Sequence, residues 1–460
     1  MLPLAKVRAG IVAVAAVVLS CQLFLPPIVG LADQGDFTRI VGRFGFRAED
    51  KSVLYGFLTR KYVPDWNARY RVYEQFSSEY IFVEAAVLLN KVVSRDGNLD
   101  ITVLGFVHML AFLCAFYYLL LATLSPLIWL LALLALTDVG YAAYWNSFYA
   151  EPATCIFFLL LLAESIAICR GPEASRLQTI RWVVWAILFV LAKPQNAPLG
   201  ILLALLVFRL RTWSKSPAAI SIAIASSLLI VAAATFIWKT SPVPNMWSSV
   251  YDQVFMTILP ESKNPARDAQ ALGLTPDWLK YSGTGAWTPG TALSNAVFSG
   301  VIGKTINHGT IARFYLLRPA RIWRHAKRML PVAFSLRPEW CGNFERSAGL
   351  PPMAKSKAFS LWSAFHESVL TACGKVILIA LLLSPVISIA VCLRLPARRR
   401  VIEFLGVLGI CCLLSFVIAI CGDAWDNVKH LFLFNLLFDA WIVTLFALLL
   451  QSVRNVLHGI

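Results

Sequence analysis

Long apolar runs, separated by polar stretches, dominate the hydrophobic pattern of this chain. The first run covers about residues 9–31 and is long enough to cross a bilayer. Because it continues well past Ser20 and Cys21, we interpret it as an uncleaved span and not as a signal peptide. Further runs follow at about 101–122, 124–141, 152–169, 179–193, 196–210, 217–238, 373–393, 401–421 and 430–451. The pattern therefore predicts an all-α polytopic membrane protein with about ten transmembrane helices.

Two parts of the hydrophobic pattern do not predict simple transmembrane spans. The runs on either side of Lys193 and Pro194 are short, so they form either two spans or one broken, re-entrant hairpin. The apolar run 80–93 is also short and carries Glu84. We expect this run to lie along the membrane interface and not to cross the bilayer.

The composition agrees with a membrane protein. Hydrophobic residues make up 58% of the 460 residues and charged residues 14%, which leaves too little polar surface to cover a soluble protein. The net charge of +16 indicates basic cytoplasmic loops and contacts with anionic lipid. The basic residues show no nucleic-acid-binding signature, so we expect no nucleic acid partner. The cysteines show neither a disulfide framework nor the spacing of zinc ligands.

The charges of the short loops predict how the chain is oriented. When the N-terminus is placed in the cytoplasm, every basic cluster of a short loop falls on that same side, as the positive-inside rule requires. These residues are Arg170, Arg176, Arg181, Arg209, Arg211, Lys215, Arg394, Arg398, Arg399 and Arg400, with Arg454 at the C-terminus. We therefore expect both termini in the cytoplasm and the longer polar loops on the other side.

The chain divides into three parts. Residues 1–238 form an N-terminal transmembrane module, expected to be catalytic, with a first extracytoplasmic loop at 32–100. Residues 239–372 form a large extracytoplasmic loop that is long enough to cover a site as a cap, and residues 373–460 form the C-terminal transmembrane helices. The polar groups that could do chemistry gather on the extracytoplasmic side.

The first candidate group follows the opening apolar run directly. If this segment is helical, Asp36 and Arg39 share a face, so that Arg39 can orient the Asp36 carboxylate and keep it ionised. An oriented carboxylate can take a proton from a hydroxyl group, which makes Asp36 a candidate general base. Asp33 is a second candidate for the same role. The alternative is a surface ion pair that ends the first helix.

The second acid is Glu151, which precedes Pro152 at the start of a predicted helix. Proline suits the first turn of a helix, and the helix macrodipole favours a carboxylate beside it. Glu151 is therefore either a favourable helix start or a second catalytic acid that binds an acceptor hydroxyl, or a metal, opposite Asp36.

Cationic side chains stand at two more places on the same side. Lys193 ends an apolar run just before Pro194, where it either extends to the interface or presents a charge to a phosphate group. Lys429 and His430 open the last span, and we expect them to contact substrate.

The long loop contains a basic stretch in which Arg321, Arg324 and Arg328 recur at helical spacing. The favoured interpretation is a basic amphipathic helix that lies on anionic lipid. The alternative is direct binding of a lipid-linked phosphate by Arg321 and Arg324.

Together these motifs resemble those of GT-C glycosyltransferases. Residues 36–39 (Asp-Phe-Thr-Arg) resemble the Asp-Glu-x-Arg element found in protein O-mannosyltransferases and in the lipid A aminoarabinose transferase. Residues 151–152 (Glu-Pro) are similar to the second acidic element of that superfamily, and residues 191–194 (Leu-Ala-Lys-Pro) to its Leu-Thr-Lys-Gly-Pro element. Residues 146–152 and 429–435 are similar to hexose transferases of bacterial surface-glycan assembly. The likeness covers most of the chain.

The resemblance implies an activity, a donor and a location. The expected enzyme is a multi-pass protein of the bacterial cytoplasmic membrane that works on the extracytoplasmic face. It would move a hexose from a polyprenyl-phosphate donor to a cell-surface glycan or lipid-linked acceptor, with inversion at the transferred carbon. Asp36 would be the general base. The departing phosphate gains charge, which Lys193, Arg39, Lys429 or the basic stretch could stabilise.

The chain departs from the GT-C pattern at two positions. Phe37 stands where the superfamily element has its second acid, so we expect no cofactor; a divalent metal is possible but not expected. Pro194 follows Lys193 directly, where the superfamily has glycine first, which leaves the geometry of that turn open.

Other membrane functions remain as alternatives. A transporter or flippase of lipid-linked oligosaccharides would carry polar residues along a pathway through the membrane midplane. Only Asn435 and Asp439 clearly lie deep in a span, and we expect Asp439 to serve in a structural pair. A polymerase of lipid-linked oligosaccharides would use the same kind of donor. The sugar and the acceptor cannot be named from these residues.

Overall fold

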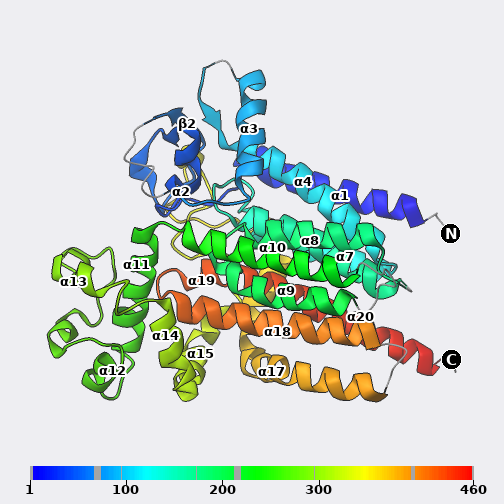
Figure 1. Cartoon of the computed structure of the whole chain (residues 1–460). Helices are drawn as coiled ribbons and strands as arrows, with labels where there is room; N and C mark the ends of the chain where they lie inside the picture. The colour runs from blue at the N-terminus through cyan, green and yellow to red at the C-terminus, as the bar shows by residue number, and fades with distance from the viewer. Residues whose placement is uncertain are drawn as a thin grey trace.

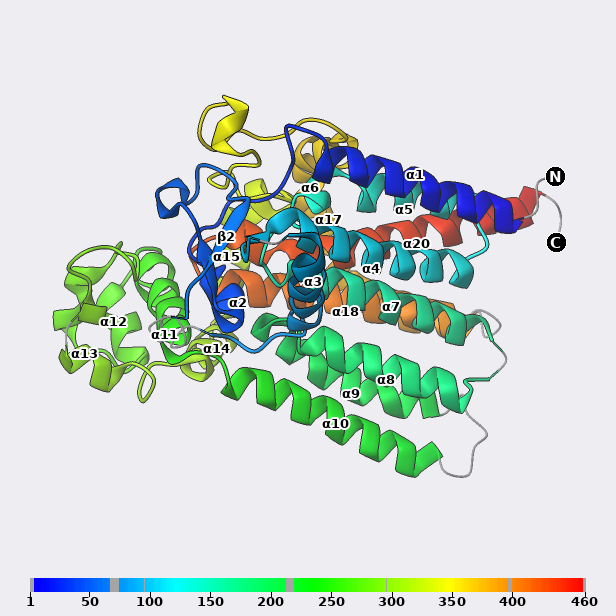
Figure 2. The ribbon, with the colours of Figure 1, turned by 90° about the horizontal axis from the view of Figure 1, so that it is seen from above.

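The computed structural model describes residues 4–66, 74–94, 96–171, 173–211, 219–294, 296–394 and 399–457. Within these ranges, ten helices with alternating directions form one bundle (Figures 1 and 2). They are α1 (Leu4–Phe24), α4 (Ile101–Ala122), α5 (Pro126–Leu136), α7 (Glu151–Arg170), α8 (Arg176–Val190), α9 (Ala197–Arg211), α10 (Ala219–Lys239), α17 (Thr371–Arg394), α18 (Arg399–Gly422) and α20 (Phe432–Leu457). Each of the ten predicted apolar runs thus forms a helix, and the all-α polytopic fold is confirmed.

The helices differ in their ability to cross a bilayer. Among the described residues, seven are long and apolar enough to do so. The exceptions are α5, with 11 residues, and α8 and α9, with 15 residues each. A 15-residue helix is about 22 Å long, which is shorter than a hydrocarbon core of about 30 Å. The expected count of about ten therefore holds for helices, whereas only seven have the length of a full span.

The two ends of the bundle differ in what they carry. One end, which we call the capped end, carries the β-sheet, α2 (Thr38–Val41) and the long loop (Figure 1). Both termini lie at the other end. The basic residues of the short connections lie at that other end too, because they flank α7, α8, α9, α17 and α18 there. Lys215 and Arg398 fall outside the described residues, as do the side chains of Arg211 and Arg454.

The first loop adds a small sheet that the hydrophobic pattern did not predict. Strands β1 (Phe46–Ala48), β2 (Lys61–Pro64) and β3 (Leu99–Asp100) pair antiparallel in the order β1-β2-β3. Helix α3 (Tyr80–Val93) has the bounds expected from the sequence and lies across the direction of the bundle (Figure 1).

The long loop folds in two parts. The first contains α11 (Val243–Asp252), α12 (Pro265–Ala271), α13 (Ala296–Val301) and α14 (His308–Leu316), and it packs around a hydrophobic core of its own. The second begins with α15 (Pro319–Ala333), which packs against the main core of the bundle instead.

A later part of the long loop supports the chain just after α1. The Ala32 N–H donates to the Gly342 carbonyl at 2.9 Å, and the Gly30 N–H donates to the Asn343 carbonyl at 3.0 Å. The first loop and the long loop, which lie about 300 residues apart in the sequence, therefore form one surface at the capped end.

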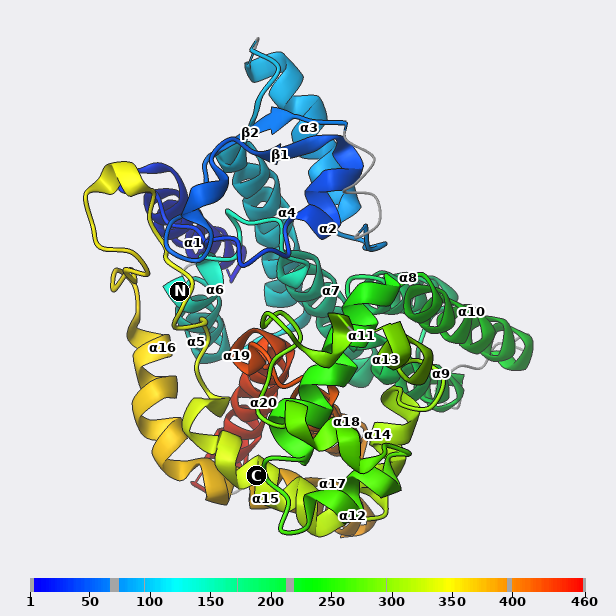
Figure 3. The ribbon, with the colours of Figure 1, turned by 90° about the vertical axis from the view of Figure 1, so that its left-hand side faces the viewer.

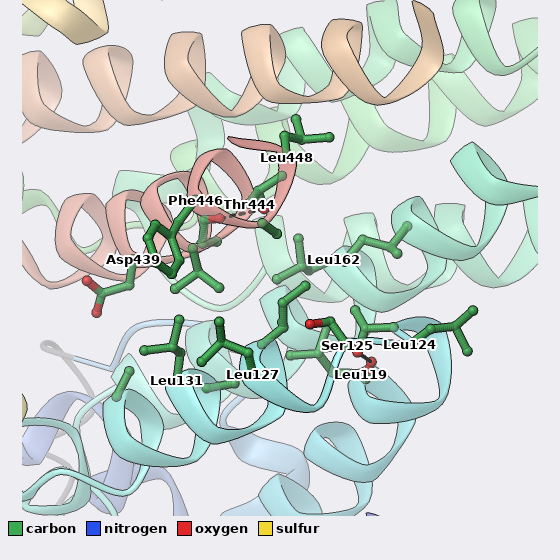
Figure 4. Close-up of a pocket in the computed structure, with 18 of the residues that line it drawn as sticks. Leu119, Leu124, Ser125, Leu127, Leu131, Leu162, Asp439, Thr444, Phe446 and Leu448 are labelled. Atoms are coloured by element: carbon green, nitrogen blue, oxygen red, sulfur yellow. Dashed lines mark hydrogen bonds between the residues drawn. The ribbon is translucent and has the colours of Figure 1, made fainter. Parts of the chain in front are cut away.

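The bundle contains a cavity of about 650 Å³ between α5, α7 and α20, lined mostly by leucine and other apolar side chains (Figure 4). Asp439 lies at its edge, with its carboxylate directed away from the labelled leucines. That carboxylate accepts hydrogen bonds from Tyr141 Oη at 2.7 Å and Trp362 Nε1 at 2.9 Å, and it contacts His366 Nε2 at 2.8 Å. Asp439 thus has the structural pairing expected of an acid inside the membrane.

Candidate functional site

A second cavity, of about 580 Å³, lies at the capped end and gathers polar residues from distant parts of the chain. We call it the candidate pocket. The predicted site residues that line it come from the segment after α1, the start of α7, the α8–α9 turn and α19 (Asn427–His430); they are Asp36, Arg39, Glu151, Lys193, Lys429 and His430. Figure 3 looks at the capped end, with α2, α11, α14 and α19 on this face.

A tight turn places Asp36 at the pocket wall. The Asp33 carboxylate accepts the N–H of Gly35 at 2.7 Å and of Phe37 at 3.1 Å, and Gly35 adopts a φ of 101°, which suits glycine. Helix α2 then begins, so that Arg39 Nη2 lies 2.8 Å from Asp36 Oδ1, as the spacing predicted. The other Asp36 oxygen contacts the Lys429 ammonium group.

The charges around Asp36 determine its ionisation. Burial acts to raise the pKa of its carboxyl group, but the nearby Arg39 and Lys429 outweigh burial and hold the pKa below its usual range. Asp36 is therefore an ionised carboxylate at neutral pH and a weak base while both cations remain in place.

Asp33 does not line the candidate pocket, because its side chain is buried in the turn beneath it. Burial raises the pKa of Asp33 to about 6, against the opposing effect of its hydrogen bonds from Phe37 and Gly35. Of the two acids proposed as the base, only Asp36 faces the cavity.

Glu151 and Lys193 form the next ion pair of the wall. Helix α7 begins at Glu151, with Pro152 in its first turn as predicted. Lys193 Nζ lies 2.7 Å from Glu151 Oε1. The Lys193 turn is held from outside, since Ser77 Oγ donates to the Ala192 carbonyl at 2.6 Å. Pro194 opens a short 3-10 helix, so the chain turns back into α9 without the glycine of the GT-C pattern.

Lys429 links the acids of the pocket. Its side chain is only 3% exposed and lies 3.4 Å from Asp426, 4.9 Å from the centre of the Tyr149 ring and against Asp36. Burial acts to lower the pKa of Lys429, but the surrounding carboxylates, Asp36 first, hold it above its usual range. Lys429 is thus a permanent cation at the wall of the cavity.

A separate group of hydrogen-bonding side chains lies farther along the pocket. His430 Nδ1 lies 3.3 Å from Gln195 Oε1, and His430 Nε2 lies 3.7 Å from Asp423 Oδ2. His308 Nε2 lies 3.1 Å from Ser249 Oγ, and burial lowers the pKa of this histidine. This group carries hydroxyl, amide and imidazole functions, which suit the hydroxyl groups of a sugar.

Sequence reasoning missed several of these residues. Gln195 and Asp423 belong to stretches that were singled out for their neighbours Lys193 and His430. Ser249 and His308 come from α11 and α14 in the long loop, where no motif marked them.

Two predicted phosphate-binding residues do not reach the candidate pocket. Arg321 contacts the Asp268 carboxylate and donates to the Glu261 carbonyl at 3.1 Å, so its charge is neutralised inside the cap. Arg324 lies on the exposed face of α15. The interpretation of this stretch as an amphipathic helix fits its structure better than phosphate binding in the pocket.

The chemistry of the pocket follows from its charges. Three cations (Arg39, Lys193 and Lys429) and three carboxylates (Asp36, Glu151 and Asp423) line one cavity. Cations held in this way can bind a phosphate group, and an ionised carboxylate can accept a proton from a hydroxyl group. Among the described residues, no group of three or more His, Cys, Asp or Glu side chains could hold a metal ion.

Comparison with known proteins identifies a family for this chain. A family described as the YfdI N-terminal transmembrane domain matches residues 5–457, which is nearly the whole chain. No curated protein and no solved structure matches the chain.

Proposed function

We propose that this chain, which belongs to the YfdI N-terminal transmembrane domain family, is an integral membrane glycosyltransferase of the GT-C type. It would transfer a hexose from a polyprenyl-phosphate donor to a cell-surface glycan or lipid-linked acceptor. The observation that carries the proposal is that Asp36, Glu151 and Lys193, which lie far apart in the sequence, line one pocket. A cluster of cations and carboxylates in one cavity is typical of functional sites and supports an enzyme.

The walls of the pocket suit a lipid-linked phosphate. The cations Arg39, Lys193 and Lys429 would bind the phosphate group of the donor. Another part of the wall is apolar and includes Trp238 at the end of α10 and Val417 in α18. Because both helices are long enough to cross the membrane, the lipid chain could remain in an apolar environment while its phosphate reaches the cations.

In the proposed reaction, an acceptor hydroxyl attacks the anomeric carbon of the hexose and gives its proton to Asp36. The bond between that carbon and the phosphate oxygen breaks, and polyprenyl phosphate leaves with an additional negative charge. Lys193 and Lys429 would stabilise that charge. Glu151 would orient Lys193 and accept a hydrogen bond from the acceptor. Direct displacement on one face inverts the anomeric carbon.

The phosphate would also activate the base. In this structure Asp36 is held by Arg39 and Lys429, which makes it a weak proton acceptor. A phosphate that attracts the same cations would weaken their effect on Asp36 and raise its basicity. Proton transfer would then be favoured only when the donor is bound.

The orientation is part of the proposal. The basic residues that flank the short connections lie at the end opposite the candidate pocket. By the positive-inside rule, that end faces the cytoplasm of a bacterial cell and the pocket faces outward. This arrangement puts the reaction on the extracytoplasmic face of the cytoplasmic membrane.

The placement of the polar residues favours an enzyme over a transporter. Asn435, in the first turn of α20, donates to the Ala333 carbonyl at 3.1 Å, and Asp439, one turn further along, is bonded as described above. These polar groups hold the bundle together and do not form a pathway through it.

The test supplies purified protein in detergent with a polyprenyl-phosphate hexose and an acceptor glycan extract, and it measures released polyprenyl phosphate. We expect wild-type protein to release the lipid and Asp36→Asn to lower the rate by about 10²–10⁴-fold. Asp277→Asn, which removes an exposed carboxylate of the cap, is the matched control and should keep the rate. An intact donor after incubation with wild-type protein would point to transport, and an active Asp36→Asn variant would remove Asp36 from the base role.

A further inference from the structure

Helix α15 has one buried face and one exposed face. The buried side chains are His325, Ala326, Met329, Leu330 and Ala333, whereas Trp323, Arg324, Lys327 and Arg328 form an exposed stripe at helical spacing. Helix α14, which precedes it, ends at Leu316, which is 76% exposed, and the next residue, Leu317, is 67% exposed. A water-facing surface would not normally carry these large apolar side chains next to each other.

Contacts with the bundle set the depth of α15. His325 Nε2 lies 2.8 Å from the carbonyl of Ile420, two residues before the end of α18. On α17, the position of Gly374 is so close to α15 that an added Cβ would lie 3.1 Å from Leu330. Both helices are long enough to cross the membrane, and both contacts lie near their ends. Helix α15 therefore lies level with the membrane surface on the capped side.

The basic residues of this region fall into two classes. Arg321 contacts Asp268, and Arg328 Nη2 lies 2.5 Å from Glu261 Oε1, so both neutralise acids of the cap. In contrast, Arg313, Arg324 and Lys327 are exposed and have no acidic partner within the ranges that the structure describes.

We propose that the corner between α14 and α15 binds anionic phospholipid of the bilayer. Arg313, Arg324 and Lys327 bind headgroup phosphates, while Leu316, Leu317 and Trp323 enter the boundary of the acyl chains. We call these six residues the lipid corner. The charge of the three cations complements that of the lipid, and a basic residue near an anionic membrane contributes about 1 kcal/mol, or about fivefold in affinity.

The lipid corner adjoins the candidate pocket. Leu316 lines that cavity together with Ile322 of α15. Binding of phospholipid at the corner would therefore hold the mouth of the pocket at a defined height relative to the headgroups. This inference does not depend on the proposed reaction, because lipid binding can be measured without turnover.

The test measures binding of phosphatidylglycerol and phosphatidylcholine to the full chain in detergent by native mass spectrometry. The variant replaces all three cations (Arg313→Gln, Arg324→Gln and Lys327→Gln). We expect its affinity for phosphatidylglycerol to fall at least about tenfold, with phosphatidylcholine unaffected. The control replaces three exposed cations of the cap (Lys263→Gln, Arg267→Gln and Lys304→Gln), removes the same charge and should bind phosphatidylglycerol as the wild type does.

Three results would overturn the proposal. The first is unchanged phosphatidylglycerol binding in the corner variant, and the second is an equal loss in the control. The third is a corner variant that loses binding of undecaprenyl phosphate but keeps binding of phosphatidylglycerol, which would make the corner a donor site and not a membrane contact. If the corner variant does not fold, the test uses the wild-type protein at two salt concentrations. Raising the salt from about 0.05 to about 0.5 M should weaken the binding of phosphatidylglycerol but not that of phosphatidylcholine. The proposal fails if phosphatidylglycerol binding does not weaken in this way.

Discussion

Two carboxylates near opposite ends of the sequence show how differently this fold uses an acid. Asp439 contacts Tyr141, Trp362 and His366 within the bundle, and all of these partners belong to packed helices or turns. Asp36 contacts the long cationic side chains of Arg39 and Lys429 at the wall of an open pocket. A phosphate group can compete for those cations, whereas the partners of Asp439 are buried inside the bundle. The difference lies in the partners and not in the acid.

The comparison predicts its largest effect at Asp439. Both ring nitrogens of His366 lie near oxygen atoms that accept hydrogen bonds, an arrangement that favours the doubly protonated, cationic ring. Asp439→Asn would leave that charge buried without a counter-ion and should lower the free energy of unfolding by about 3–5 kcal/mol. Thermal unfolding in detergent measures the loss. Asp277→Asn serves again as control, and an unchanged melting temperature for Asp439→Asn would contradict the structural role.

The next effect is expected at Lys429, on activity. Lys429→Gln removes the buried cation that would stabilise the departing phosphate, so the transfer rate should fall by about 10²–10³-fold. Lys280→Gln, on the exposed surface of the cap, should have no effect on the same release assay. If Lys429→Gln lost stability but kept its rate per folded molecule, Lys429 would resemble Asp439 and the contrast between the two sites would disappear.

The smallest effect concerns Asp33 and the dependence of stability on pH. Its pKa is raised from 3.8 to about 6, so the folded protein binds this proton more tightly than the unfolded chain does. The contribution of Asp33 to the free energy of unfolding is therefore largest below about pH 4 and is lost as the pH rises through about 6. Asp33→Asn retains an oxygen acceptor for Gly35 and Phe37 without the charge. It should be more stable than the wild type at pH 7 by about 2–3 kcal/mol.

The same variant separates the two candidate bases. Because Asp33 lies beneath the pocket, Asp33→Asn should keep most of the transfer rate that Asp36→Asn loses. Denaturation midpoints of wild type and Asp33→Asn between about pH 4 and pH 7 test the stability part. If the midpoints of the two proteins differ by the same amount at every pH in this range, Asp33 does not titrate as described. If Asp33→Asn loses the transfer activity, Asp33 is again a candidate for the general base.

Local patterns predicted several features well. The bounds of α3, the start of α7 at Glu151 and the Asp36–Arg39 pair all follow from run length, from proline and from i, i+3 spacing. Each of these depends on residues close together in the sequence. The lengths of α8 and α9 were visible in the same way, but nothing local could show whether they cross the bilayer fully.

Features that depend on distant contacts were not predictable in this way. Phosphate binding by Arg321 was the alternative interpretation of its basic stretch, yet Asp268 neutralises this arginine within the cap. Ser249 and His308 reach the pocket only because α11 and α14 fold over the end of the bundle. The pairing of Lys193 with Glu151 likewise joins two helix ends that no spacing rule connects.

The sequence by itself determined that this protein is a many-helix membrane protein, approximately where its helices lie and which basic residues flank its short connections. These properties depend on hydrophobic run length and on neighbouring residues, whose effects act along the chain. Only the tertiary structure decided which charges meet in the pocket, which are neutralised elsewhere and which remain exposed. The physical reason is that a charge takes its role from its partners and its burial, and both are set by the packing of distant segments.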